Sequence, residues 1–153
     1  MGAKPLIRPS AKLYDQDFAL WTAEAARLLR EGRFQEIDIE HVAEEIEDMG
    51  KRDYREVLSR LALILQHLLK WQFQPDKRTG SWKTALINQR REIELVFEQS
   101  PSLRRAAVQL LPCAYRQAIQ DAAGETGMPE DSFPHECPYT LEQALDRRFF
   151  GGS

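Results

Sequence analysis

One acidic segment of the chain contains the residue types that bind metal ions. Glu44, Glu45, Glu47 and Asp48 lie within five consecutive residues, shortly after His41. On a helix that turns about 100° per residue the four acids spread around most of the circumference, whereas His41, Glu45 and Asp48 share one flank. Carboxylate and imidazole groups at this spacing can hold a divalent cation that activates water, if another helix supplies further ligands. A metal-binding protein or metal-dependent hydrolase is therefore one hypothesis.

The ligand set on this flank is incomplete. Helical di-metal proteins use Glu-x-x-His motifs on two helices together with further glutamates. Here only Asp38-x-x-His41 resembles such a motif, and it occurs once. Acidic residues in the first turns also interact favourably with the helix dipole. We therefore expect a solvated, partly ion-paired flank, no cofactor and no catalytic residue, and we favour a protein that is not an enzyme.

A second segment, residues 70–91, is basic and contains aromatic residues. Its basic residues are Lys70, Lys77, Arg78, Lys83, Arg90 and Arg91, and Asp76 is its one acid. Basic residues interleaved with aromatic rings can bind single-stranded nucleic acid by neutralising phosphates and stacking on bases. The formal charge of the whole chain is -3, unlike the usual basic footprint of such proteins. Nucleic-acid binding is therefore the third and least favoured hypothesis.

The separation of charge along a nearly neutral chain favours a non-enzymatic interaction or regulatory module. Its acidic flank, residues 40–48, and its basic corner, residues 70–91, would meet a protein partner or a second copy of the chain. Complementary charges chiefly set the orientation and rate of association, and they make it sensitive to salt. The residues expected to make these contacts are Glu44, Glu47, Lys70, Lys83, Arg90 and Arg91.

Other polar residues have structural interpretations. His67 lies among apolar residues and is expected to be a hydrogen-bonded histidine in the core or at its boundary. Cys113 and Cys137 form no Cys-x-x-Cys motif, so they indicate neither a disulfide framework nor a zinc site. Gln89 lies on the apolar stripe of its helix, so we expect its buried amide to make a hydrogen bond.

The elements that position these residues are helices. Apolar residues recur at helical spacing along the 153 residues, and no stretch alternates with the period of two that strands show. We predict an all-α fold, a compact bundle of about four to six helices with a short C-terminal helix and no sheet. Residues 1–12, with Pro5 and Pro9, predict a flexible leader, and residues 13–150 predict a single helical domain.

The helix that carries the acidic segment poses a question at Gly50. Asp38 is its expected N-cap, and one face bears the apolar residues Ile39, Val42, Ile46 and Met49. If the helix continued, Asp53 would fall within that apolar face, whereas a break would let Asp53 and Glu56 form a capping box. We expect a kink or break between Gly50 and Asp53.

A continuous helix would have a different electrostatic consequence. It would bring Glu47 within reach of Lys51 and Asp48 within reach of Arg52, as favourable pairs four residues apart. Whether the helix continues therefore decides whether Asp48 is neutralised within the chain or faces a partner.

The later helices have recognisable starts and ends. Gly32 fits the C-terminal cap of the first long helix, Ser81 is the expected N-cap of a later one, and Pro112 should kink the helix that contains it. Gly124, Gly127 and Pro129 are expected to interrupt the helical pattern. Thr140 and Gln143 predict a capping box that opens a short last helix reaching about residue 148.

The chain shows no targeting or membrane signal. No window approaches the ~18 apolar residues of a membrane-spanning helix, and the N-terminal residues lack the apolar segment of a signal peptide. We expect a cytoplasmic protein.

Several ordered motifs resemble one known family. They include LYDQDFALW, EIDIEHVAEEIEDMG, HLLKWQFQPDKRTGSW and FPHECPYTLEQAL. Together with QRREI and SPSLR they resemble the bacterial helical family catalogued as domain of unknown function 29, over about residues 13–149. The resemblance implies a compact, mostly helical protein of the bacterial cytosol. It implies no activity and transfers no catalytic residue.

Overall fold

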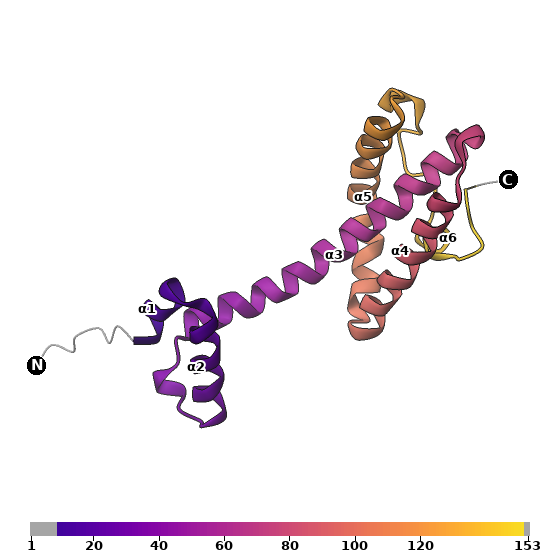
Figure 1. Cartoon of the computed structure of the whole chain (residues 1–153). Helices are drawn as coiled ribbons and strands as arrows, with labels where there is room; N and C mark the ends of the chain where they lie inside the picture. Colours follow the sequence, from indigo (N-terminus) through magenta and orange to yellow (C-terminus); the bar gives the residue numbers. More distant parts are fainter. Residues whose placement is uncertain (1–8, 152–153) are drawn as a thin grey trace, which may run out of the picture. The chain divides into compact units, whose positions relative to one another are not determined.

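A computed structural model describes residues 9–151 of the chain, and within them the fold is all-α (Figure 1). Its six helices are α1 (Pro9–Gln16), α2 (Phe18–Arg30), α3 (Ile39–Phe73), α4 (Gly80–Gln99), α5 (Ser102–Thr126) and α6 (Leu141–Leu145). Three 3-10 turns, Phe34–Glu36, Pro75–Lys77 and Glu130–Ser132, lie in the connections. No strand occurs in the described part, which confirms the predicted all-helical class with its short C-terminal helix. None of these helices combines the length and apolar character of a membrane span.

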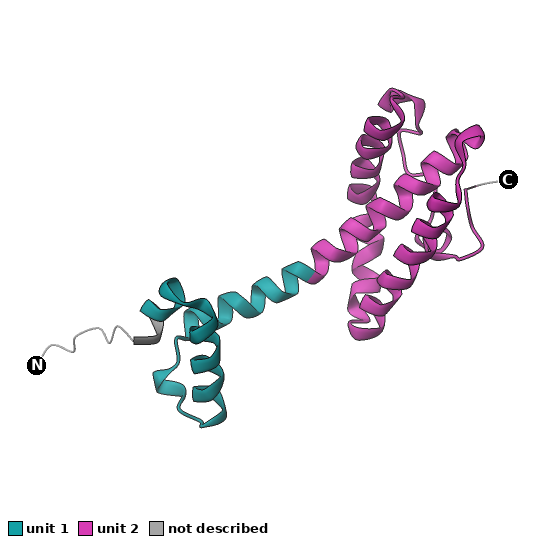
Figure 2. Ribbon diagram, viewed as in Figure 1, with its two compact units in different colours: residues 1–52 teal, residues 53–153 magenta. Residues whose placement is uncertain are grey.

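The chain divides into two compact units, residues 1–52 and 53–153 (Figure 2). The sequence predicts one domain over residues 13–150, whereas the structure has two units. The reason is that the buried residues of the main core all come from Val57 or later, so the first unit contributes none of them. The predicted leader also needs correction, because α1 starts at Pro9. Residues 1–8 of that leader lie outside the described residues.

The core of the second unit is built on the later part of α3. Leu61, Ile64, Leu65 and Leu68 are fully buried, together with residues of α4, α5 and α6. Alanines of α5, namely Ala107, Ala114, Ala118 and Ala122, are also buried. These small side chains allow neighbouring helices to approach closely. The later part of α3 is thus central to this unit.

The predicted kink or break between Gly50 and Asp53 is wrong. α3 runs without interruption from Ile39 to Phe73, and Gly50 does not have a positive φ. Asp53 does not need to start a new helix because its side chain is exposed to water. An acidic residue can therefore occupy a position on the apolar side of the helix without being desolvated.

Helix ends agree in part with the predicted signals. Gly32 follows α2 with a φ of 71°, and Thr140 forms the predicted capping box with Gln143. The N-cap of α4 is Thr79 instead of Ser81, and the Thr79 hydroxyl accepts a hydrogen bond from the backbone N–H of Trp82. The reason is that the helix starts earlier, at Gly80.

On the C-terminal side the interruption predicted at Gly127 is confirmed, whereas the one predicted at Gly124 and the predicted end of the last helix need correction. α5 continues through Gly124 to Thr126 and stops at Gly127, whose φ of 72° is the left-handed conformation that glycine adopts readily. α6 ends at Leu145, earlier than residue 148, because Asp146 has an extended backbone with ψ of 120°. Pro112 lies inside α5, which continues on both sides of it.

Candidate interaction surface

Aromatic residues of α1 and α2 cover one flank of the first part of α3. The Tyr14 ring stacks on the His41 imidazole with 3.9 Å between ring centroids, and it meets the Trp21 ring edge-on at 4.8 Å. Phe18 also packs against both Tyr14 and Trp21. Trp21 is buried together with Ala25, Leu28 and Ile37, whereas Phe18 is 48% exposed, so the aromatic cluster lies at the edge of the small core of the first unit.

His41 is held by a carboxylate and by this aromatic cluster. Its Nδ1 atom lies 2.5 Å from Asp38 Oδ2, and the side chain of Asp38 is nearly buried. The hydrogen bond to Asp38 raises the pKa of the His41 imidazole. The rings of Tyr14 and Trp21 therefore attach His41, and with it α3, to α1 and α2, while Asp38 at the start of α3 holds the imidazole in place.

Glu45 has a partner on the same flank. The Tyr14 hydroxyl donates a hydrogen bond of 2.5 Å to Glu45 Oε1. Because this hydrogen bond to a carboxylate stabilises the protonated hydroxyl, it raises the pKa of Tyr14 to about 12. One oxygen of Glu45 is thereby fixed by Tyr14, which orients the carboxylate at the edge of α3.

The predicted metal ligands do not form a metal site. His41 and Glu45 are engaged by Asp38 and Tyr14, as described above, and Asp48 lies one turn further along. Among residues 9–151 no group of three or more His, Cys, Asp or Glu side chains is arranged to hold a metal ion. The geometry therefore does not favour the hypothesis of a metal-dependent protein.

The remaining charges on this part of α3 have no ionic partner. Glu44, Glu47, Lys51 and Arg52 are exposed, and none of them takes part in an ion pair within the described chain. The helix is continuous, yet the predicted pairs of Glu47 with Lys51 and of Asp48 with Arg52 do not form. These charges are free to meet groups on another molecule.

The apolar face of the first part of α3 is exposed to solvent. Ile39, Ile46 and Met49 are 57%, 63% and 61% exposed, and Val42 is half-buried. We call these four residues the α3 seam. The sequence predicts that these four residues share one face of a helix, and in the continuous α3 they do. It did not predict that the chain itself would leave that face largely uncovered.

Two residues of the predicted basic corner are buried. Lys70 is 5% exposed, and its Nζ atom lies 2.5 Å from Glu125 Oε2 and 4.8 Å from the centroid of the Trp82 ring. Arg90 is 1% exposed. Neither side chain lies on a surface that a partner of the folded chain could reach, so the structure removes both from the predicted contact residues.

Arg90 instead binds the C-terminal segment of the chain. Its Nε donates to the carbonyl of Ala144 at 2.8 Å, and its Nη2 donates to the carbonyl of Phe149 at 2.6 Å. Burial lowers the pKa of the guanidinium. Because a guanidinium offers several donors in a fixed fork, one side chain can hold two separate backbone stretches.

Two exposed cations of the corner, Lys83 and Arg78, lie against the chain's own aromatic rings. Lys83 Nζ is 5.5 Å from the centroid of the Phe150 ring, and Arg78 lies 5.0 Å above Trp71. Arg91 is exposed and donates to Asn88 Oδ1 at 3.1 Å. The rings that would have to stack on bases are thus already in contact with protein cations, which does not favour nucleic-acid binding.

The other singled-out polar residues have structural roles. His67 is half-buried and its Nδ1 lies 2.8 Å from the carbonyl of Leu63, in agreement with the boundary position predicted. Gln89 is half-buried and accepts a hydrogen bond of 3.0 Å from Arg60. Burial raises the pKa of the Cys137 thiol, which donates to the carbonyl of Tyr139. A raised pKa disfavours the thiolate form that a cysteine nucleophile needs.

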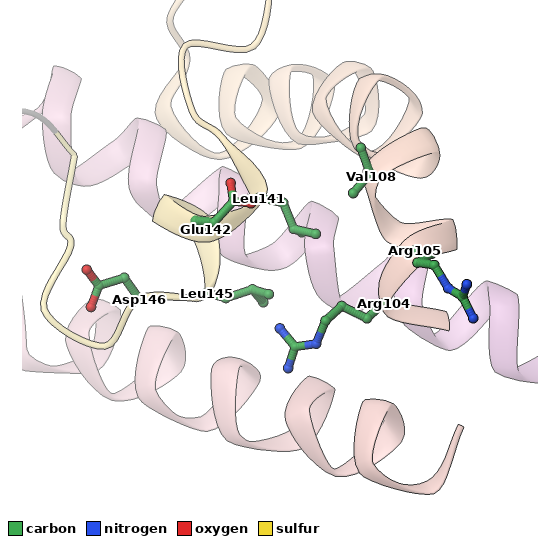
Figure 3. A pocket seen from close by; sticks show the side chains of 7 residues that line it. All are labelled: Arg104, Arg105, Val108, Leu141, Glu142, Leu145 and Asp146. Atoms are coloured by element: carbon green, nitrogen blue, oxygen red, sulfur yellow. The ribbon is translucent and has the colours of Figure 1, made fainter. Parts of the chain in front are cut away.

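A surface pocket of about 450 Å³ opens between α5 and α6 in the second unit. Figure 3 shows Arg104 and Arg105 on α5, and Leu141, Glu142 and Leu145 on α6. Arg104 already forms an ion pair with Glu94. Within the described residues, no buried side-chain polar atom without a partner lines this pocket, so its lining does not select a ligand.

The sequence contained a signal for the burial of Arg90. Leu86, Arg90, Ile93 and Phe97 are the buried residues of α4, at spacings of four, three and four. The stripe predicted from the sequence used Gln89 in this place, and both positions satisfy the helical period equally well. Hydropathy ranks glutamine and arginine alike as polar. It therefore cannot predict which of the two is buried, when the buried one is the arginine whose hydrogen bonds to carbonyls offset its burial.

Comparison with known proteins gives one match. The family model described as "Domain of unknown function DUF29" matches residues 13–150. No curated protein and no solved structure matches the chain.

Proposed function

Since the chain belongs to the DUF29 family, whose description names no activity, we propose its function from the geometry of the chain itself: it is a non-enzymatic protein-interaction module. Its contact surface is the first part of α3, where the α3 seam is bordered by the free charges Glu44, Glu47, Lys51 and Arg52. The proposal keeps the cytoplasmic location expected from the sequence.

The single observation that carries the proposal is the exposure of the α3 seam. Exposed apolar surface is unfavourable by about 25 cal/mol per Å² relative to buried surface. Single exposed apolar side chains are common on proteins, but Ile46 and Met49 are adjacent on one helical face and are each more than 60% exposed. A partner that covers this face would gain from its burial.

The free charges around the seam support the same surface. Paired charges on a helix stabilise the monomer, whereas Glu47 and Lys51 stay apart although they are spaced for a pair. Charges at the rim of an interface act mainly on the rate and orientation of association. The acidic contact residues predicted from the sequence therefore remain in the proposal, with Lys51 and Arg52 in place of the buried Lys70 and Arg90.

The test is the double substitution Ile46→Ser and Met49→Ser. The wild-type chain and the variant would be immobilised and incubated with lysate of the source cells and with a differently tagged copy of the chain. Bound proteins would be quantified by mass spectrometry at low and high salt. We expect the variant to lose the proteins that the wild type retains, with no change in the melting temperature of dilute protein, because both side chains are exposed within one chain.

The matched control is Ile87→Ser and Leu95→Ser on α4, two side chains that are 47% and 52% exposed in the second unit. This control should retain the same proteins as the wild type. If the seam variant and the control bind the same proteins as the wild type, the α3 seam is not a contact surface and the proposal is wrong.

A further inference from the structure

We infer that the partner of the α3 seam is a second copy of this chain, whose α3 packs antiparallel on the first. Ile46 of one copy lies against Met49 of the other, and Glu45 of each copy pairs with Arg52 of the other. This inference rests on the proposed function and names its partner.

The width of the seam indicates that the partner is a helix. Ile39, Val42, Ile46 and Met49 follow steps of three, four and three, which are the a and d positions of a heptad repeat. A helix that packs on a broad protein surface usually has a wider apolar stripe, whereas an a/d-only stripe is the narrow seam of a two-helix contact. Ile46 and Met49, its most exposed members, mark the centre of the contact.

The order of charges selects the antiparallel direction. Acidic residues Glu44, Glu45, Glu47 and Asp48 come first, and Lys51 and Arg52 follow. In a parallel pair the acidic stretches of the two copies would lie side by side, whereas in an antiparallel pair each acidic stretch lies beside a basic one. Charged residues that flank a helix seam commonly set partner choice and orientation in this way.

Glu45 and Arg52 are the charged residues that flank this seam. They share one heptad position next to the a residues, so in an antiparallel pair they face each other across one side of the contact. Arg52 has no ionic partner in the described chain. Glu45 is oriented by Tyr14 through Oε1, which leaves its second oxygen able to accept from an arginine.

Gly50 provides an independent observation on the opposite side of the seam. It lies within α3, where glycine weakens a helix relative to alanine, and a Cβ added there would meet no atom within 4 Å. The fold of one copy therefore does not require a glycine. In the antiparallel pair Gly50 and Ala43 of the two copies face each other, and their small side chains allow the two backbones to approach closely.

The test uses charge reversal in the full-length chain, with association followed by analytical ultracentrifugation from micromolar to millimolar concentration. Arg52→Glu should weaken self-association by roughly tenfold or more, since it replaces two attractive contacts by two repulsive ones. Glu45→Lys should do the same. A mixture of the two single variants should associate again, because each then meets an opposite charge at both positions.

The double variant, Glu45→Lys with Arg52→Glu, separates the antiparallel pair from other arrangements. It should associate with itself as the wild type does, and it should not associate with wild-type chains, because every flanking contact between them is repulsive. If Glu45→Lys disturbs the fold through loss of the Tyr14 hydrogen bond, Arg52→Glu still tests the pair, since the Arg52 side chain forms no ion pair in the described chain.

Gly50→Gln gives a readout that a purely structural role would not give. Glutamine favours the helix, so the variant should melt at a higher temperature, yet its bulk should weaken self-association. If the melting temperature and the strength of self-association both increased, the inferred contact would be wrong. If the wild type stays monomeric while the seam variant loses a different protein, the inference is wrong and the proposed function stands. If neither self-association nor any other binding responds to the seam variant, both are wrong.

Discussion

The two parts of α3 have the same apolar periodicity and opposite burial. In the first part Ile46 and Met49 are exposed, whereas in the second part Leu61 and Leu65 are fully buried among α4, α5 and α6. Helical spacing thus predicts which side chains share a face in both parts. Whether the same chain covers that face depends on segments that lie far away in the sequence.

The charged residues of the two parts differ in the same manner. Lys70 is buried and pairs with Glu125, which is far from it in the sequence, whereas Lys51 is exposed and has no ionic partner in the described chain. In the second part of α3 the charge of Lys70 is therefore paired within the chain. In the first part the charge of Lys51 remains available for another molecule.

The largest expected effect tests the difference in burial directly. Leu65→Ala should lower the free energy of unfolding by about 2 to 5 kcal/mol, because it removes buried methyl groups and leaves a cavity. Ile46→Ala should change it by less than about 0.5 kcal/mol, because the side chain is exposed. Urea denaturation of dilute protein measures both values. Equal losses for the two variants would show that the first part of α3 is covered within the chain.

Two adjacent arginines of α4 extend this comparison. Arg90→Ala should lower the free energy of unfolding by roughly 2 to 4 kcal/mol, because buried carbonyls of Ala144 and Phe149 lose a charged donor. Arg91→Ala should have an effect of less than about 0.5 kcal/mol, since Arg91 is exposed. Thermal denaturation and limited proteolysis of the C-terminal segment would measure the difference.

A conservative variant shows whether the guanidinium fork matters in this position. Arg90→Lys keeps the charge but supplies one ammonium group in place of two separate donors. It should recover only part of the stability lost in Arg90→Ala. Full recovery would mean that the charge alone, and not the pair of hydrogen bonds, holds the C-terminal segment.

Two glycines are expected to respond in opposite directions. Gly50→Ala should raise the free energy of unfolding by about 0.5 to 1 kcal/mol, because Gly50 lies inside α3 and an added Cβ meets no atom. Gly127→Ala should lower it by about 1 kcal/mol or more, because its φ of 72° strains a residue with a Cβ. Melting at low protein concentration separates these effects from any self-association.

The smallest expected effect concerns the pH dependence of the first unit. The hydrogen bond to Asp38 raises the pKa of His41 above its ordinary value of 6.5. The stability from this pair is therefore fully present below pH 6.5, and it is lost as the pH rises through the raised pKa of His41. A proton NMR titration of the imidazole would measure that pKa.

Asp38→Asn is the control for this titration. It keeps the size of the side chain and removes the charge, so the pKa of His41 should fall. An unchanged His41 pKa in Asp38→Asn would show that the carboxylate is not its cause.

Much of the fold could be predicted from the sequence because local signals determine it. The helical class, the apolar face of α3, the Thr140 capping box and the Gly32 cap depend on residues within a few positions of each other. The break expected at Gly50 failed for a physical reason. Asp53 resembles the start of a new helix, but an exposed carboxylate does not compel one, and helical neighbours on both sides keep the chain in α3.

The proposed contact surface could be predicted only in part. Glu44 and Glu47 are exposed as expected, whereas Arg90 and Lys70 are buried because distant carbonyls and a distant carboxylate accept their hydrogen bonds. Such partners lie more than fifty residues away, so no local pattern contains them. The engagement of His41 and Glu45 likewise depends on Tyr14, which belongs to another helix.

The distribution of tryptophans makes the two units optically distinguishable. Trp21 is buried in the first unit, and the other two tryptophans, Trp71 and Trp82, belong to the second. A chain with Trp71→Phe and Trp82→Phe would therefore emit tryptophan fluorescence from the first unit alone, and one with Trp21→Phe from the second alone. Denaturation curves from the two emitters would reveal whether the units unfold in a single cooperative transition or one after the other.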